Sequence, residues 1–213
     1  MAAVLLLGAS GLAREVLPVL RAAGRDVLGV LDDRYDERHL DLPRAVSGAP
    51  VLGTVDDVGL FPEAEVLVCV GPSEGRAAVV ARAEDLGVSR WATVLDPTVR
   101  NPAGCPVGEG SVLLAGVTIT ADAEVGAHVV AMPGVTITHD CRVDEFATLA
   151  AGVALGGGVH VGRGAYLGMN ATVRPGAEVG AGATVGMGAV VLADVPPHET
   201  WAGVPARRLE VSA

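Results

Sequence analysis

The chain contains no lysine, so all 15 of its basic residues are arginine. Catalysis through a lysine nucleophile or a lysine Schiff base is therefore excluded. Basic residues are also outnumbered, because 25 Asp and Glu residues give a net charge of −10 at pH 7. An acidic surface repels nucleic acid backbones and anionic membrane surfaces, so we expect neither nucleic acid nor a membrane as a partner.

Cysteine is scarce as well, with Cys69, Cys105 and Cys141 as the only three. They are too few and too far apart for a disulfide framework or a CxxC metal site, which favours a reducing compartment. Apolar runs of membrane-spanning length are also missing. Residues 2–9, AAVLLLGA, follow no basic region and precede no small-residue cleavage site, so they predict a buried strand rather than a signal peptide. We therefore expect a cytoplasmic protein.

Up to residue 92 the sequence alternates short apolar runs with amphipathic segments. The runs at 3–9, 26–33 and 65–71 predict strands, and the segments at 14–24 and 74–87 predict helices. This alternation is typical of parallel strands joined by helical crossovers. Residues 1–92 are thus expected to form an α/β Rossmann-like domain, with a ligand cleft beyond the carboxyl ends of the strands.

From Leu95 onward the pattern has a strict period of six. Fifteen of the seventeen residues at this spacing between Leu95 and Val191 are Leu, Ile or Val. An α-helix repeats its apolar positions every three to four residues, so the period excludes a helix. Three hexads make one triangular coil of about eighteen residues, in which each apolar side chain stacks on its equivalent in the next coil. Residues 93–213 are expected to form an all-β, left-handed parallel β-helix with a short C-terminal tail.

A histidine beside a carboxylate, His139 with Asp140, is the candidate catalytic pair. A neutral imidazole accepts the proton that an amine or hydroxyl loses on attacking a thioester, and the carboxylate fixes the tautomer of the ring and stabilises the imidazolium. The alternative is a histidine at an exposed corner of the β-helix. Zinc ligation by His128, His139 and His160 is not expected, because no two of them are separated by a whole number of coils.

Candidate substrate-binding residues follow the predicted N-terminal strands. A strand-to-helix turn contains Gly8, Ser10 and Gly11, and N–H groups at such a helix start bind phosphate. Asp32 and Asp33 end the second strand, where a carboxylate commonly contacts ribose or base, with solvated surface acids as the alternative. The facing wall of the cleft is expected to contain Gly71, Ser73 and Arg76.

Five segments occur in a specific order: GASG at 8–11, VLDD at 30–33, VCVG at 68–71, ITHDC at 137–141 and GVPARRL at 203–209. With the hexad run they resemble the hexapeptide-repeat sugar acetyltransferases. More narrowly, they resemble the group that acetylates UDP-4-amino-sugars in bacterial glycan synthesis, and its sialic acid O-acetyltransferase relatives. The resemblance spans nearly the whole chain. It implies a homotrimer, acetyl-CoA between neighbouring β-helices, and a nucleotide-sugar held by the N-terminal domain.

The resemblance also assigns roles to residues in the β-helix. It makes His139 the general base, with Asp140 where the family has the longer glutamate, and it places the N–H of Gly157 at the oxyanion of the tetrahedral intermediate. The residues that it implies for binding CoA are Met169, Asn170, Met187 and Arg207, with Arg208 beside the last near the CoA phosphates. For all of these, packing or an ordinary corner or tail position is the alternative.

The substrate is less well specified than the CoA chemistry. Many relatives have histidines where this chain has Leu12 and Thr148. N-acetylation of a nucleotide-linked amino-sugar is the first hypothesis, and O-acetylation of a sugar hydroxyl, as on sialic acid, is its rival because one histidine serves both reactions. A hypothesis of another class is a non-enzymatic trimer that binds a nucleotide-sugar.

Overall fold

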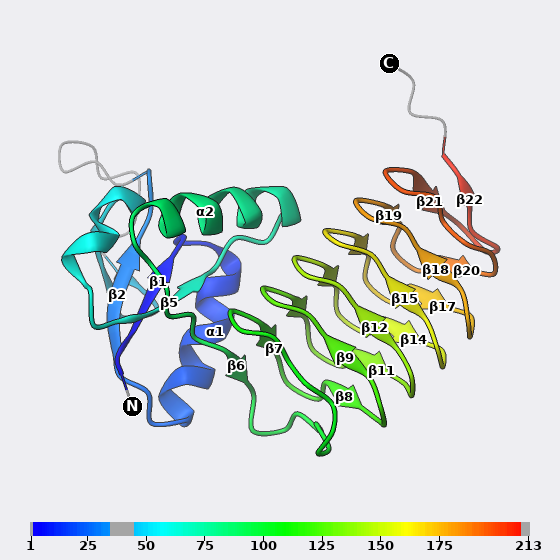
Figure 1. Ribbon diagram of the computed structural model, residues 1–213, viewed down its shortest axis with the longest axis horizontal. Coiled ribbons are helices and arrows are strands. Elements are labelled where there is room, and N and C mark those ends of the chain that lie inside the picture. The colour runs from blue at the N-terminus through cyan, green and yellow to red at the C-terminus, as the bar shows by residue number, and fades with distance from the viewer. Residues whose placement is uncertain (1, 35–44, 210–213) are drawn as a thin grey trace. The chain divides into compact units, whose positions relative to one another are not determined.

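A computed structural model describes residues 2–34 and 45–209. The chain divides into two compact units, Met1–Val94 and Leu95–Ala213, and Figure 1 shows a mixed α/β unit and a coiled stack of strands. No helix in the described part of the chain is long and apolar enough to cross a bilayer.

The N-terminal unit has a sheet in the order β3-β4-β2-β1-β5, in which every pairing is parallel except that of β3 with β4. The predicted Rossmann-like fold is confirmed. Its elements are β1 (Val4–Leu7), α1 (Gly11–Ala22), β2 (Val27–Leu31), β3 (Ala45–Val46), β4 (Ala49–Gly53), the 3-10 helix η1 (Val55–Leu60), β5 (Glu65–Val68) and α2 (Ser73–Asp85).

The strand order creates a switch point between β1 and β5. From β1 the chain adds β2 and then β4 on one side, and it returns to place β5 on the other side. The four side chains of β1 are fully buried, as expected for a central strand covered on both faces. In open α/β sheets, ligands bind beyond the carboxyl ends of the strands at such a switch point.

The C-terminal unit is the predicted left-handed parallel β-helix, whose three faces are sheets of very short strands. Face I is the order β22-β21-β19-β16-β13-β10-β7-β6, face II is β20-β17-β14-β11-β8, and face III is β18-β15-β12-β9. The strands are β6 (Val94–Leu95), β7 (Val112–Leu113), β8 (Thr118–Ile119), β9 (Glu124–Val125), β10 (Val130–Ala131), β11 (Thr136–Ile137), β12 (Arg142–Val143), β13 (Thr148–Leu149), β14 (Ala154–Leu155), β15 (His160–Val161), β16 (Tyr166–Leu167), β17 (Thr172–Val173), β18 (Glu178–Val179), β19 (Thr184–Val185), β20 (Val190–Val191), β21 (Thr200–Ala202) and β22 (Arg207–Arg208).

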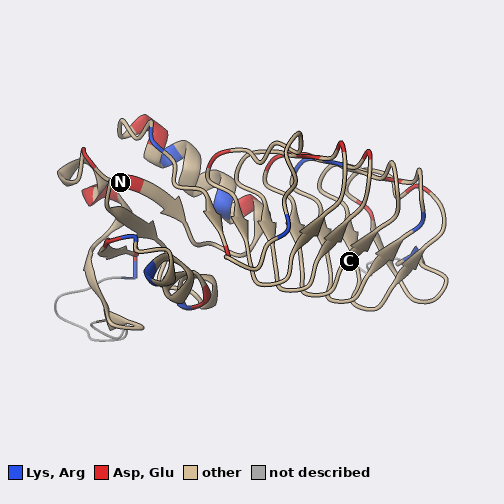
Figure 2. Cartoon of the chain, turned by 90° about the horizontal axis from the view of Figure 1, so that it is seen from below, with Lys and Arg blue, Asp and Glu red and all other residues tan. Residues whose placement is uncertain are grey.

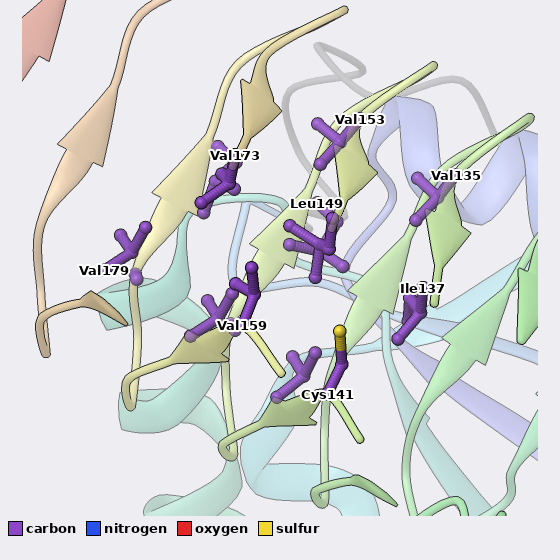
Figure 3. Close-up of a cluster of buried hydrophobic side chains, with 14 of the residues drawn as sticks. Val135, Ile137, Cys141, Leu149, Val153, Val159, Val173 and Val179 are labelled. Atoms are coloured by element: carbon purple, nitrogen blue, oxygen red, sulfur yellow. The ribbon is translucent and has the colours of Figure 1, made fainter. Parts of the chain in front are cut away.

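The register confirms the eighteen-residue coil. Ile137 pairs with Leu155, and Leu155 pairs with Val173. The last coil is two residues shorter, because Thr184 pairs with Thr200. The hexad residues point inward and form one continuous core with the small residues between them, as Figure 3 shows for the middle coils. Cys105 and Cys141 belong to this core, and both are free thiols.

Each corner needs one residue with left-handed backbone geometry. Every sixth residue from Gly110 to Gly188 has a positive φ, and most of these residues are glycine, which adopts it without steric cost. The exceptions in this stretch are Asp122, His128, Asp140, Phe146 and Asn170. Side chains in this conformation cluster at functional sites, and Asp140 and Asn170 are both candidate site residues.

Candidate active site

His139 and Asp140 form the corner between β11 on face II and β12 on face III. The Nδ1 of His139 lies 2.6 Å from Oδ2 of Asp140. Both side chains are about two-thirds exposed, at 65% and 66%. An ionised carboxylate only accepts hydrogen bonds, so the proton between the two groups sits on Nδ1. The other ring nitrogen, Nε2, is then the basic one, and it is accessible for chemistry.

Gly157 lies one coil further along, directly against the imidazole. A Cβ placed on Gly157 would lie 2.4 Å from Cε1 and 2.5 Å from Nε2 of His139. Equivalent places at other corners hold alanine, as at Ala121, Ala151 and Ala181. Glycine at position 157 therefore makes room for the ring. The structure thus brings three of the predicted site residues together at one corner.

Three of the residues predicted to bind CoA, Met169, Asn170 and Met187, lie at another corner. Met169 and Asn170 connect β16 on face I to β17 on face II, and Met187 occupies the same corner one coil later. The methionine side chains are 47% and 68% exposed. Face II separates this corner from His139 by six residues per coil, roughly 15–20 Å of extended chain. Within one chain, the two groups of predicted residues do not meet.

The methionine corner differs from the rest of the surface in its lack of charge. Its residues in successive coils are Ala115-Gly116, Pro133-Gly134, Ala151-Gly152, Met169-Asn170 and Met187-Gly188. Figure 2 shows one edge of the β-helix where the backbone has no acidic or basic positions, while these positions gather along other parts of the coils. In an acidic protein, this uncharged corner is suited to an uncharged, partly apolar segment of a ligand.

Arg207 and Arg208 form β22 at the end of the described β-helix, and both are exposed. Arg207 donates to the carbonyl of Ala206 at 2.8 Å, and Arg208 pairs with Glu199 at 3.2 Å. The Arg207 guanidinium therefore faces no carboxylate within ion-pair distance among the residues described. It keeps its charge for an anionic group, such as a phosphate.

At the N-terminal switch point the ends of β1 and β5 touch. Ser10 caps α1, because its hydroxyl accepts from the N–H of Leu12 at 3.0 Å, and it donates to the carbonyl of Cys69 at 2.6 Å. Gly8 has φ of +104°, and a Cβ there would lie 2.9 Å from the same carbonyl. Gly11 begins α1. The turn therefore has the compact shape expected of a phosphate-binding loop.

Asp32 and Asp33 both hold parts of the N-terminal unit in place. Asp32 is buried and accepts from the N–H of Ala9 at 2.6 Å and from Arg34 at 2.9 Å. Burial raises the pKa of Asp32, but the hydrogen bonds from Arg34 and Ala9 lower it more, so the pKa lies below its usual value. Asp33 accepts from the Val55 N–H at 3.1 Å and pairs with Arg82.

The facing loop is shaped by a buried arginine. Arg76 on α2 donates to the carbonyls of Val70 at 2.9 Å and Gly71 at 2.8 Å. Burial lowers the pKa of Arg76 to about 10, so the guanidinium stays charged at neutral pH. Gly71 is exposed, and Ser73 begins α2. Arg76 thus fixes the backbone of the loop that contains both predicted residues.

The histidines do not assemble into a metal centre. His128 occupies a corner between faces III and I, and His160 is in β15 on face III, whereas His139 is at the corner of faces II and III. Among residues 2–34 and 45–209, no group of three or more His, Cys, Asp or Glu side chains is placed to hold a metal ion. Leu12 and Thr148 are both buried.

This chain combines a β-helix of hexapeptide repeats with an exposed imidazole–carboxylate pair at one corner. The combination indicates an acyltransferase built from hexapeptide repeats. Models of three families match the chain. The PglD N-terminal domain matches residues 3–83, the hexapeptide repeat of succinyl-transferase matches 99–121, and the bacterial transferase hexapeptide matches 158–193. The comparison with curated proteins gave no match.

Solved structures match the whole chain. The perosamine N-acetyltransferase from Caulobacter crescentus, a histidine-to-asparagine variant in complex with CoA and GDP-perosamine, is 33% identical, with 99% of this chain and 98% of that chain covered and a TM-score of 0.91. The acetyltransferase domain of PglB from Neisseria gonorrhoeae is 28% identical, with 98% and 100% covered and a TM-score of 0.87. WeeI from Acinetobacter baumannii is 26% identical over 98% and 100%, with a TM-score of 0.71. The chain belongs to the hexapeptide-repeat sugar N-acetyltransferases with a PglD-type N-terminal domain, and it is an acyltransferase.

Proposed function

We propose that this enzyme transfers the acetyl group of acetyl-CoA to the amine of a nucleotide-linked amino-sugar, with His139 as general base. The observation that carries the proposal is the corner where Asp140 holds Nδ1 of His139 and the ring lies against Gly157. Full-length similarity to an N-acetyltransferase crystallised with CoA and GDP-perosamine supports the substrate class.

His139 manages the proton in this reaction. The sugar amine attacks the thioester carbonyl and forms the C–N bond, while Nε2 of His139 takes a proton from the attacking nitrogen. Asp140 stabilises the imidazolium that results. When the C–S bond of the tetrahedral intermediate breaks, the imidazolium returns the proton to the leaving thiolate, giving CoA and the amide. Because the amine attacks directly, no covalent acyl-enzyme is needed.

We assign to the N–H of Gly157 the role of hydrogen-bond donor to the oxyanion of the tetrahedral intermediate. The N–H of Gly157 makes none of the backbone hydrogen bonds found in the described part of the chain. A preorganised N–H that faces the developing negative charge stabilises the tetrahedral intermediate. The absence of a side chain lets the imidazole and the thioester approach this N–H together.

Acetyl-CoA fits the residues at the methionine corner. The exposed residues Met169 and Met187 offer apolar surface to the uncharged arm of the ligand, and Asn170, next to Met169 in sequence, offers a hydrogen-bonding group. The Arg207 guanidinium suits the phosphates. Acetyl-CoA acts as a co-substrate that supplies the acetyl group.

We propose a homotrimer, because the base and the methionine corner lie on opposite edges of face II. One ligand can contact both groups if the His139 corner of one subunit lies beside the methionine corner of the next. Face II supports such packing because its outward-facing strand residues are small and uncharged, namely Thr118, Thr136, Ala154, Thr172 and Val190. Closed symmetric assemblies build sites of this kind from two different surface patches.

The nucleotide-sugar is assigned to the N-terminal unit. The switch point supports this, because the turn that carries Gly8, Ser10 and Gly11 lies against the end of β5. The remaining proposed contacts are Asp32, Asp33, Gly71 and Ser73. We also place the enzyme in the cytoplasm, since three free, buried thiols suit a reducing compartment.

The test is incubation of the purified protein with acetyl-CoA and a panel of acceptors that contains GDP-perosamine, UDP-4-amino-sugars and free sialic acids. Thiol release reports turnover, and alkaline hydroxylamine then separates the products, because it cleaves oxygen esters and leaves amides intact. An amide on a nucleotide-linked amino-sugar is the expected result. A hydroxylamine-sensitive product on a sugar hydroxyl would assign O-acetylation, and nucleotide-sugar binding without turnover on any acceptor would assign a binding protein.

A further inference from the structure

The corner that carries His139 departs from the hydrogen-bond pattern of the other coils. At the corner between faces II and III, the residue that follows the face II strand donates its N–H to a carbonyl in the next coil. Examples are Thr120 to Ile137 at 3.1 Å and Gly156 to Val173 at 2.9 Å. The described structure contains no such bond from the N–H of Thr138. Instead, the hydroxyl of Thr138 donates to the carbonyl of Leu155 at 2.7 Å.

The turn bond is also absent here, as it is at the same corner one coil earlier, where no bond from the Ala123 N–H to the Thr120 carbonyl occurs among the described residues. One coil later, the N–H of Val159 donates to the carbonyl of Gly156 at 3.3 Å and closes the turn. The equivalent bond from Cys141 to Thr138 is absent from the backbone hydrogen bonds of the described residues. The thiol of Cys141 instead donates to the carbonyl of Gly156 at 3.2 Å. The side chains of Thr138 and Cys141, which flank the catalytic pair, thus both donate hydrogen bonds to backbone carbonyls of the next coil.

These two bonds act on the backbone that leads into Gly157. Cys141 is buried in the core, so the Gly156 carbonyl that it binds points into the coil. A trans peptide unit is planar, with its C=O and N–H directed oppositely. The N–H of Gly157 belongs to the same peptide unit as this carbonyl, so it points out of the coil, where the imidazole lies against Gly157.

We propose that Cys141 and Thr138 are positioning residues for the reaction, which orient the Gly156–Gly157 peptide so that the Gly157 N–H meets the oxyanion. This inference rests on the proposed acetyl transfer. Neither side chain reaches the reacting atoms in this scheme: Cys141 acts from inside the coil, and Thr138 fixes the preceding carbonyl of Leu155. A misdirected oxyanion donor lowers kcat without weakening substrate binding.

Cys105 provides a matched control for Cys141. It is buried in the same inward column two coils away, so truncation to alanine removes the same thiol from the same core. We expect Cys141→Ala to lower kcat by about 10-fold or somewhat more. This loss is smaller than the 10²–10³-fold loss typical of a deleted oxyanion donor, because the donor is misdirected and not removed. The KM values for both substrates should stay within about twofold of the wild-type values. Cys141→Ser keeps a donor and should recover most of kcat, while Cys105→Ala should leave kcat within about twofold at a similar loss in Tm.

Thr138 gives a second test that spares the core. Thr138→Val removes the hydroxyl and keeps the shape, Thr138→Ser keeps the hydroxyl, and Thr120→Val is the control in the same column one coil earlier. Steady-state kinetics should show a fall in kcat for Thr138→Val, but not for Thr138→Ser or Thr120→Val. This rescue by serine separates orientation from packing, because serine is the smaller side chain.

The outcomes separate this inference from the proposed function. Acetyl transfer by the wild type that is abolished in His139→Ala, together with kcat values for Cys141→Ala and Thr138→Val equal to those of their controls, would overturn the positioning role and leave the function intact. Equal losses in Cys141→Ser and Cys141→Ala would also overturn it, because donation would then be irrelevant. A wild type that acetylates no acceptor would refute the proposed function itself.

Discussion

At the scale of single residues, the surroundings of His139 are set by one neighbour in sequence and one in space. Asp140 reaches the ring because its own backbone has a positive φ of 59°, a conformation that aspartate tolerates better than most residues. Gly157 sits beneath the opposite part of the ring. The imidazole is thus oriented while about two-thirds of the side chain stays exposed.

Gly157→Ala should inactivate the enzyme without destabilising it. The new Cβ would lie 2.4 Å from the ring, and the exposed imidazole can swing away to relieve the clash. We expect Tm to change little, while kcat falls about 100-fold, as for other small displacements of a catalytic group. The double variant Gly157→Ala, His139→Ala is the control, and it should be no slower than His139→Ala alone. A full-rate alanine variant would contradict the close approach.

Asp140→Asn should preserve the backbone of the corner and make His139 less effective as the general base. Asparagine also tolerates positive φ, so the fold should persist. An amide can present its N–H₂ to Nδ1 and favour the wrong tautomer, and it does not stabilise the imidazolium. We expect kcat to fall by about 100-fold with little change in the KM for acetyl-CoA, measured by thiol release. Wild-type kcat in Asp140→Asn would show that the pair is only structural.

At the scale of elements, a second kind of glycine keeps the coils close together. Gly126 and Gly162 have no positive φ, yet a Cβ on either would lie within 2.7 Å of a backbone nitrogen in the next coil. Backbone atoms in a stacked sheet cannot move aside as an exposed imidazole can. The same residue type thus serves packing at these positions, whereas at Gly157 it makes room for the imidazole of His139.

Gly162→Ala should therefore destabilise the β-helix, in contrast to Gly157→Ala. The added methyl group would meet the N of Ala181 at 2.6 Å. Overpacking of this kind costs about 1–3 kcal/mol, which equilibrium denaturant unfolding can measure. Equal stability of the two alanine variants would contradict the distinction between the two glycine roles.

Face III carries a ladder of charged side chains around Asp144. Arg142 donates to Asp144 at 2.8 Å and His160 lies 2.9 Å from it, while Glu124 and Glu178 occupy the neighbouring rungs. Burial raises the pKa of Asp144, but the hydrogen bonds from His160 and Arg142 outweigh it, so the pKa lies below its usual value. A lowered pKa in the folded state means that ionised Asp144 stabilises the fold.

Asp144→Asn should cost stability at neutral pH and not in acid. The contribution of Asp144 is present above the unfolded pKa of about 3.9 and is lost as the pH falls through the lower folded value. We expect a difference of about 0.5–1 kcal/mol at pH 7 that shrinks below about pH 4. Unfolding followed across pH would check this, with Asp122→Asn as the control at an exposed corner. A difference that grows in acid would contradict the sign.

The sequence predicted the regular elements well because their patterns are local. A period of six, with Leu, Ile or Val at almost every step, leaves only the triangular coil, and it placed residues as far apart as Leu113 and Val191 in one core. The strand β4, which lies between β2 and β3, was missed, because Pro50 and Gly53 make its segment look like a turn. The shortened last coil also gave no hexad signal of its own.

The candidate site was predictable only in part. A motif can point to His139, Asp140 and Gly157, but contacts between distant residues leave no local trace. The bond from Cys141 to the Gly156 carbonyl and the pairing of Asp33 with Arg82 are of this kind.

At the scale of the whole molecule, the proposed trimer combines the His139 corner of one subunit with the methionine corner of the next in each site. Co-expression of His139→Ala with Met187→Glu, under two affinity tags, would give mixed trimers. Each variant alone should be inactive, but about a quarter of the sites in a random mixture would pair an intact His139 corner with an intact methionine corner. Recovered activity in purified mixed trimers supports the shared site. No recovery would place both groups in one chain's own site.

The assignment of His139 as the base is tested most directly by replacing it with asparagine, which has similar polarity and no basic nitrogen. Steady-state rates with acetyl-CoA and the accepted amino-sugar should fall by about 100-fold or more, with the Kd for acetyl-CoA unchanged by calorimetry. A variant that retains the wild-type kcat would contradict the assignment.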